Sequence, residues 1–204
     1  RDAFVALQLL REGGELGLRA VKNIPVELLD ETIGLGVRTG YGDDWLRIGN
    51  IKVFLDGALG PRTAHMMSPY EGEPQNIGLA LTGSEELLEW AKRASAEGLA
   101  MTVHAIGDRA NHKVLEVYRL LREYEKSLDI LPQERRHRIE HLQLLHRGDL
   151  GKLGNLDVIA SMQPIHATSD MAMADRYWGS RCEMAYSWHT HMKAGATLAF
   201  GSDA

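Results

Sequence analysis

The sequence has 204 residues, 44% of them hydrophobic and 25% charged, and a formal net charge of −5. This length supports one sizeable core, and the acidic balance speaks against a nucleic-acid surface, which needs a basic patch. The sequence contains no run of about 18 apolar residues, so no membrane span is predicted. The single cysteine, Cys182, excludes an internal disulfide and fits a reducing, cytoplasmic environment.

Helical and extended patterns alternate along the chain, which predicts a parallel α/β fold. Residues 1–12 carry apolar positions at helical spacing and end at a Gly-Gly pair, and residues 16–21 form a short candidate strand. A stronger strand is predicted at residues 46–55, followed by a loop rich in Gly and Pro at residues 57–81. A loop of that length in a compact domain is usually either disordered or functional.

The second half of the chain repeats this alternation. Thr82 and Glu85 form a capping box that predicts a helix ending near Gly98, and Asp108 is the expected N-cap of the next helix. Further strands are predicted at residues 99–105, 138–142, 158–163 and 197–200. An open doubly wound sheet would also fit this order, but it would normally carry a Gly-rich phosphate turn, which the sequence lacks.

The pattern therefore favours a (β/α)8 TIM barrel. About six strands are predicted, whereas the complete barrel has eight. Because the chain opens on Arg1 inside a helical pattern and stops at Ala204 directly after a strand, we expect a truncated barrel. Residues 1–204 would then form a partial barrel domain that contains about strands 3 to 8.

Four of the predicted strands carry a polar residue inside them or just after them. Lys52 lies in the strand at 46–55, His104 and His141 lie near the ends of the next two, and Asp203 follows the last. In a barrel the carboxyl ends of the strands meet on one face, so these side chains are expected to converge. Strand alternation predicts that Lys52 and His104 face the interior while their apolar neighbours face the helices.

These residue types can bind metals or transfer protons, although each one alone also has a structural interpretation. Lys52 is the hardest to explain as structure, because an ammonium group among apolar neighbours is costly to bury. Desolvation lowers the pKa of a lysine, and a neutral amine can react with carbon dioxide to give a carbamate that bridges two metals. His189 and His191, two positions apart in an expected helix at 184–194, point to different faces and are interpreted as structural.

Five segments around these residues form a recognisable series: IKVFLDGALG at 51–60, VHAIGDRA at 103–110, RIEHLQ at 138–143, SMQP at 161–164 and GSDA at 201–204. In this order they resemble the strand motifs of amidohydrolase family 3, the branch that includes N-substituted formamide deformylase. The resemblance implies a TIM barrel with two divalent metal ions, expected to be zinc, at its mouth. The HxH pair on the first barrel strand and the small β-rich flanking domain of that family are absent from this sequence. We therefore expect the isolated chain to have weak activity or none.

The resemblance also implies roles by position. Lys52 would be the carboxylated bridging ligand, His104 and His141 would bind the second metal, and Asp203 would be both ligand and general base. The metals would lower the pKa of a bound water and polarise the scissile carbonyl, while Asp203 passes the proton to the leaving nitrogen. Four further residues are expected to line the substrate pocket: Arg62, Gln163, His166 and Asp170. The alternative that these four are solvated loop residues stays open.

The predicted function is metal-dependent hydrolysis of a carbon–nitrogen bond other than a peptide bond, in a small amide or formamide-like molecule. Hydrolysis of a cyclic amide or an ester stays open, because the strand-end residues are shared machinery and specificity lies in the loops. A non-catalytic or regulatory barrel that keeps the scaffold is the alternative from another class. The partner is expected to be a small molecule, with no nucleic acid and no membrane, and a homo-oligomer stays open.

Overall fold

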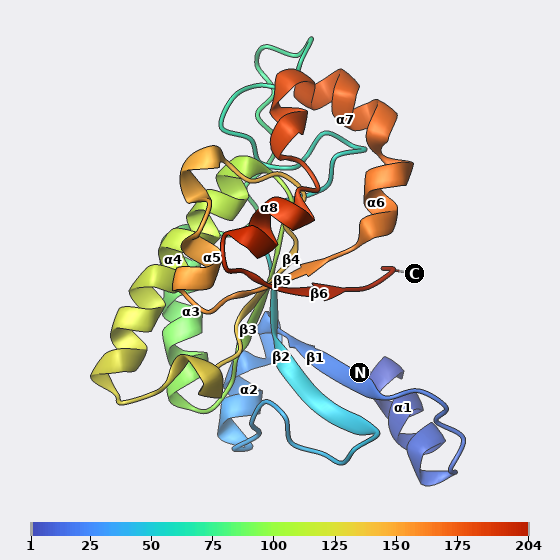
Figure 1. Cartoon of the computed structure of the whole chain (residues 1–204). Helices are drawn as coiled ribbons and strands as arrows, with labels where there is room; N and C mark the ends of the chain where they lie inside the picture. The colour runs from blue at the N-terminus through green and yellow to red at the C-terminus, as the bar shows by residue number, and fades with distance from the viewer. Residues whose placement is uncertain (1, 204) are drawn as a thin grey trace.

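The computed structural model of the chain describes residues 2–203 and contains one curved sheet with helices packed on its outer side (Figure 1). In the described residues the sheet has six strands in the order β1-β2-β3-β4-β5-β6, and every neighbouring pair is parallel. Each strand thus lies beside its neighbour in sequence. This is the strand order of a (β/α)8 barrel, and it confirms the predicted fold class of a truncated barrel.

Strands and helices follow one another through most of the chain. The strands are β1 (Ala20–Pro25), β2 (Leu46–Phe54), β3 (Met101–Ala105), β4 (Arg138–His141), β5 (Ile159–Met162) and β6 (Thr197–Phe200). The helices are α1 (Asp2–Glu12), α2 (Leu29–Gly34), α3 (Ser84–Ala96), α4 (Asp108–Ser127), α5 (Lys152–Asn155), α6 (Pro164–Ser169), α7 (Met171–Trp178) and α8 (Trp188–Lys193). Among the described helices, none has the length and apolar character needed to cross a bilayer.

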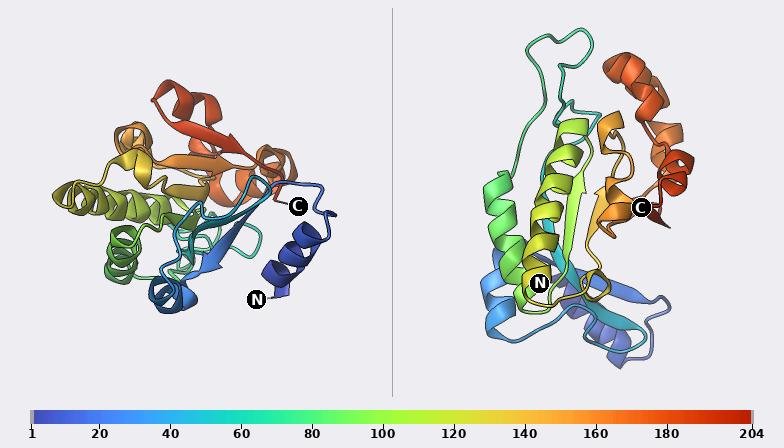
Figure 2. Two further views of the ribbon diagram at one scale, coloured as in Figure 1. Left: turned by 90° about the horizontal axis from the view of Figure 1, so that it is seen from below. Right: turned by 60° about the vertical axis from the view of Figure 1, so that its left-hand side comes forward.

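The two faces of the sheet differ, as the alternation predicts. One face packs against α3 and α4, which lie outside the curve of the sheet (Figure 2), and it contributes to the main apolar core. Alternate positions on the other face carry Lys52, Thr102 and His104. The core-side residues of β2 and β3 are Ile51, Val53, Met101, Val103 and Ala105.

The loop at 57–81 is ordered although it contains no regular helix or strand. Leu59, Met66 and Tyr70 are buried in a second apolar cluster that also includes Trp178 of α7. The Tyr70 hydroxyl donates a hydrogen bond of 2.8 Å to the Ala64 carbonyl inside the loop. Figure 1 shows this loop rising beyond the strand ends beside α7. The loop is therefore packed and not disordered, and a functional role for it stays a prediction.

The first strand lies later in the chain than the sequence pattern indicates. The candidate strand at 16–21 is wrong in position, because β1 spans Ala20–Pro25 and pairs with β2 from Ala20 onward. The alternation around β1 is irregular, and its register shifts between Lys22 and Ile24. The pairing with β2, which is a long-range contact, therefore decides where β1 begins.

Two predicted helix caps are also wrong. Helix α3 follows Gly83 without a side-chain cap, because the Thr82 hydroxyl instead donates 2.8 Å to the Phe54 carbonyl at the end of β2. Asp108 is the first residue of α4 rather than its N-cap, and its carboxylate accepts the Met67 N–H at 2.8 Å. In both places a polar side chain joins the helix start to a distant segment, and the N-cap position itself is a glycine, Gly83 or Gly107.

Candidate metal centre

The four polar residues predicted to converge do come together at the carboxyl ends of the strands. His104 lies near the end of β3 and His141 ends β4, its parallel neighbour. The two imidazole rings are 4.6 Å apart between centroids and meet edge to face. Burial lowers the pKa of both histidines, the charge of Lys52 lowers it further, and the charge of Asp203 raises it. The structure thus brings residues from β2, β3, β4 and the segment after β6 into one site.

His141 reaches this site because the backbone turns at the end of β4. Simple alternation would place its side chain on the face of Ile139, which is buried against the helices. Instead, φ is 75° at His141 and 45° at Leu142, both in the left-handed region. Such residues cost on the order of 1–3 kcal/mol each and concentrate at functional sites. The turn directs the imidazole of His141 toward His104.

A backbone carbonyl fixes which nitrogen of His104 can bind a ligand. His104 Nε2 lies 2.9 Å from the Gly57 carbonyl oxygen, which can only accept, so Nε2 carries the hydrogen. The lone pair on Nδ1 is then left for a ligand. Burial lowers the pKa of His104 to about 4, so the ring is neutral at neutral pH. A neutral imidazole is the form that binds metals.

Gln163 fixes which nitrogen of His141 can bind a ligand, through a hydrogen bond to the other nitrogen of that ring. His141 Nδ1 lies 2.8 Å from Gln163 Oε1, and the Gln163 amide nitrogen donates to the Ser161 carbonyl at 3.3 Å. That second bond orients the amide so that its oxygen faces the ring, and Nδ1 is therefore the donor. Burial also lowers the pKa of His141. His141 thus presents a neutral ring with a lone pair on Nε2.

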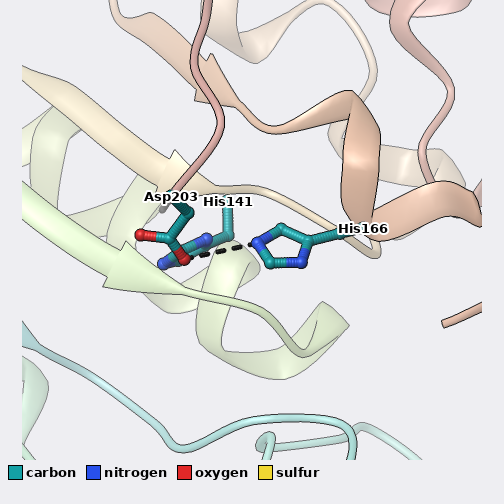
Figure 3. Close-up of side chains that lie close together, drawn as sticks. All are labelled: His141, His166 and Asp203. Carbon is teal, nitrogen blue, oxygen red and sulfur yellow. Dashed lines mark hydrogen bonds and ion pairs between the residues drawn. The ribbon is translucent and has the colours of Figure 1, made fainter. Parts of the chain in front are cut away.

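His166 completes a tight cluster with His141 and Asp203 (Figure 3). One ring nitrogen of each histidine and one carboxylate oxygen of Asp203 lie within 4.8 Å of one another. His166 Nε2 is 3.3 Å from Asp203 Oδ2. His166 lies on α6, which starts with Pro164 directly after β5, so its ring returns to the strand ends. His166 was predicted only as a pocket residue, and the Gln-Pro-x-His spacing is the signal that places it here.

This donor set fits a divalent transition metal ion. Zinc binds imidazole nitrogen and carboxylate oxygen at about 2.0–2.2 Å, so two atoms on one ion are at most about 4.4 Å apart. In a tetrahedral site two such atoms are about 3.4 Å apart, so the three donors, which lie within 4.8 Å of one another, have to move closer together to bind one ion. His104 Nδ1 is an additional neutral donor beside the cluster, at the end of the neighbouring strand β3.

Lys52 is partly buried on the same face, with its Nζ 4.8 Å from the centroid of the Phe54 ring. Burial lowers the pKa of Lys52, although the charges of Glu140 and Asp203 act in the opposite direction. Lys52 also lines a groove of about 430 Å³ together with Lys22 and Phe54.

Asp56 organises the neighbouring backbone, a role that the sequence did not reveal. It is buried, and burial raises its pKa to about 7. Asp56 Oδ1 lies 3.7 Å from His104 Nε2. The carboxylate thus ties the loop at 57–81 to the end of β3 through three backbone N–H bonds of 2.8–3.0 Å, from His65, Ile106 and Gly107.

The structure separates the four residues predicted to line the substrate pocket. Gln163 and His166 lie at the candidate metal centre, as described above. Arg62 forms an ion pair of 2.5 Å with Glu73 and lies over the Tyr177 ring, so it joins the loop to α7. The Asp170 carboxylate accepts hydrogen bonds from the hydroxyls of Ser169 and Tyr186. Substrate binding by these four residues stays a prediction.

The sequence of this chain is similar to a known family and to two known proteins. A family model described as "Amidohydrolase family" matches residues 1–204. The chain is 35% identical over 162 residues to Protein LONG AFTER FAR-RED 3 of Arabidopsis thaliana, and 33% identical over 162 residues to Putative amidohydrolase YtcJ of Bacillus subtilis (strain 168). Both alignments cover 78% of this chain, but only 27% and 29% of those two relatives.

A solved structure is also similar over the whole chain. An uncharacterized metal-dependent hydrolase from Pyrococcus furiosus superposes with a TM-score of 0.86 at 31% sequence identity. The match covers 100% of this chain and 41% of that protein, so the chain spans less than half the length of these relatives. The family model matches the entire sequence, and the chain therefore belongs to the amidohydrolase family.

Proposed function

We propose that this chain carries the metal centre of a hydrolase that cleaves a carbon–nitrogen bond, other than a peptide bond, in a small amide or formamide-like molecule. Family membership and the similarity to a protein described as a metal-dependent hydrolase support the general class. The observation that carries the proposal is that two neutral, oriented histidines, His104 and His141, lie with ring centroids 4.6 Å apart at the strand ends, and that Asp203 lies in a cluster with His141.

The residues that would hold metal are the ones whose donor atoms are left available. These are His104 through Nδ1, His141 through Nε2 and Asp203 through its carboxylate. Zinc is the expected metal, because imidazole and carboxylate ligands suit it. When bound, such an ion polarises a carbonyl and lowers the pKa of water.

Lys52 would contribute through a covalent modification. In its neutral form the Nζ lone pair attacks the carbon of carbon dioxide, an N–C bond forms, and one proton is released to solvent. The product is a carbamate with two oxygen donors and one negative charge, which can bridge two ions. The lowered pKa of Lys52 favours the neutral amine that this reaction needs.

Asp203 is the proposed proton carrier. It takes a proton from the attacking water and delivers it to the leaving nitrogen, so that amine and carboxylic acid separate. The loop at 57–81, which the Asp56 contacts hold against β3, lies beside the site and is the proposed source of specificity. Cyclic amides and esters fit the same centre and are included in the test.

The test measures hydrolysis of a panel of N-substituted formamides, linear amides, cyclic amides and esters by the metal-loaded protein. Asp203→Asn should lower the rate by about 10²- to 10⁴-fold. Asp129→Asn is the matched control, because Asp129 has nearly the same φ, 57° against 58°, and is an exposed residue in the turn after α4. Equal rates for the two variants would overturn the role of Asp203. A longer protein that contains this chain, binds zinc and still hydrolyses none of these substrates would overturn the proposal in favour of a non-catalytic barrel.

A further inference from the structure

We infer that His166 is itself a metal ligand, and that His141, His166 and Asp203 together hold one divalent transition metal ion. This inference rests on the proposed metal centre but adds a ligand to it. The resemblance to amidohydrolase family 3 implies Lys52, His104, His141 and Asp203 and assigns no ligand to the segment after β5. The structure places His166 of that segment in the cluster.

The distance between His166 and Asp203 suits shared coordination better than a hydrogen bond. His166 Nε2 and Asp203 Oδ2 are 3.3 Å apart. Hydrogen bonds between a charged carboxylate and a nitrogen are usually about 2.7–2.9 Å long. Two atoms bound at about 2.1 Å to a tetrahedral ion are about 3.4 Å apart. This one pair therefore stands at the edge length of a tetrahedral site, whereas the three donors together, within 4.8 Å of one another, have to move closer as an ion binds.

The orientation of the rings supports the same interpretation. Because Gln163 occupies His141 Nδ1, the ring of His141 has only Nε2 to offer. The His141 and His166 rings are 5.8 Å apart between centroids, with an interplanar angle of 60°. Rings that stack face to face would not aim lone pairs at a common point, whereas tilted rings with converging nitrogens do. Figure 3 shows both rings approaching the Asp203 carboxylate from different sides.

The backbone at two of the three residues is also held in an uncommon conformation. φ is 75° at His141 and 58° at Asp203. Left-handed backbone at non-glycine residues costs on the order of 1–3 kcal/mol and persists where the surrounding structure requires it. Here the strain brings two donors from β4 and from the segment after β6 to the histidine on α6.

The chemistry of the three donors indicates the class of ion. Two imidazole nitrogens and one carboxylate, with a further position open, are the ligand set of catalytic zinc sites and suit cobalt(II) equally well. Magnesium and calcium prefer oxygen ligands only. The inference therefore predicts binding of zinc or cobalt(II) and weak binding of magnesium.

The test is a titration of the chain with cobalt(II), followed through its visible absorption, together with competition for zinc by a chelating dye. Four proteins are compared: wild type, His141→Ala, His166→Ala and His189→Ala. His189 is an exposed histidine on α8 and serves as the matched control. We expect His166→Ala to lower zinc affinity at least about 100-fold and to change the cobalt(II) spectrum, because loss of a ligand exceeds the 10- to 100-fold effect of outer partners.

The possible outcomes separate this inference from the proposed function. Circular dichroism first establishes that the variants are folded. If His141→Ala loses the metal while His166→Ala keeps the affinity and spectrum of the His189→Ala control, His166 is not a ligand, and only this inference fails. If wild type binds neither zinc nor cobalt(II), the inference and the proposed function both fail.

Discussion

The hydrogen bond from His141 to Gln163 offers a sharp test of how the site is oriented. Replacing Gln163 with alanine removes the acceptor 2.8 Å from His141 Nδ1, so the ring loses both its fixed tautomer and its orientation. Loss of such an outer partner typically lowers metal affinity 10- to 100-fold, about 1.4–2.7 kcal/mol. Gln163 is only 8% exposed, so water replaces the acceptor poorly, and we expect the loss to approach about 100-fold.

A second substitution at the same position tests whether the hydrogen-bond acceptor itself is what sustains zinc affinity. Gln163→Glu keeps an oxygen acceptor and makes the hydrogen bond charge-assisted, so zinc affinity should match or exceed that of wild type. Gln133→Ala, at an exposed position in the turn before β4, is the control. Zinc affinity is measured by chelator competition at pH 7.5. Equal affinities for Gln163→Ala and Gln133→Ala would refute the proposed orientation of His141.

Three further predictions concern the framework behind the site. His137 is fully buried, its Nε2 lies 2.7 Å from Glu125, and its Nδ1 accepts the Met101 N–H at 2.9 Å. His137→Ala should therefore lower the free energy of unfolding, measured by urea denaturation, by about 3–5 kcal/mol. A loss below about 1 kcal/mol would contradict this prediction. Asp56→Asn places an amide group against backbone N–H donors and should lower the free energy of unfolding by about 1–3 kcal/mol at pH 8. The control Asp44→Asn, at an exposed position, should change the free energy of unfolding by no more than about 0.5 kcal/mol. Although burial raises it, hydrogen bonds from His137 and other neighbours lower the pKa of Glu125 from 4.5 to about 2. The stabilisation by this carboxylate is therefore complete above about pH 4.5 and disappears as the pH falls toward 2, so Glu125→Gln should destabilise the protein more at pH 6 than at pH 3, and an equal loss at both would argue against the assignment.

The sequence predicts the barrel and its two faces well because both follow from local patterns. Strands β2 and β3 alternate between core-side apolar residues and inner-face residues, so Lys52 and His104 can be placed from period-two alternation alone. The order of the motifs then predicts which strands are neighbours. The convergence of residues from different strands follows from barrel geometry rather than from any single residue.

The details that the sequence does not predict depend on irregular backbone geometry or on distant partners. Alternation points His141 away from the site, and only the left-handed turn at the end of β4 corrects this. The place of His166 depends on how α6 folds back after β5, and the role of Asp56 depends on N–H groups up to 51 positions away. Thr82 and Asp108 looked like local caps but bond to distant segments.

The central claim is that the strand ends of this chain form a metal centre, and the most direct measurement is the zinc content per chain. The chain and its His141→Ala variant are loaded with zinc, passed through gel filtration and analysed by mass spectrometry. The account predicts about one zinc ion or more per wild-type chain and close to none in the folded variant. A wild-type chain without zinc, or a variant that retains as much, would contradict it.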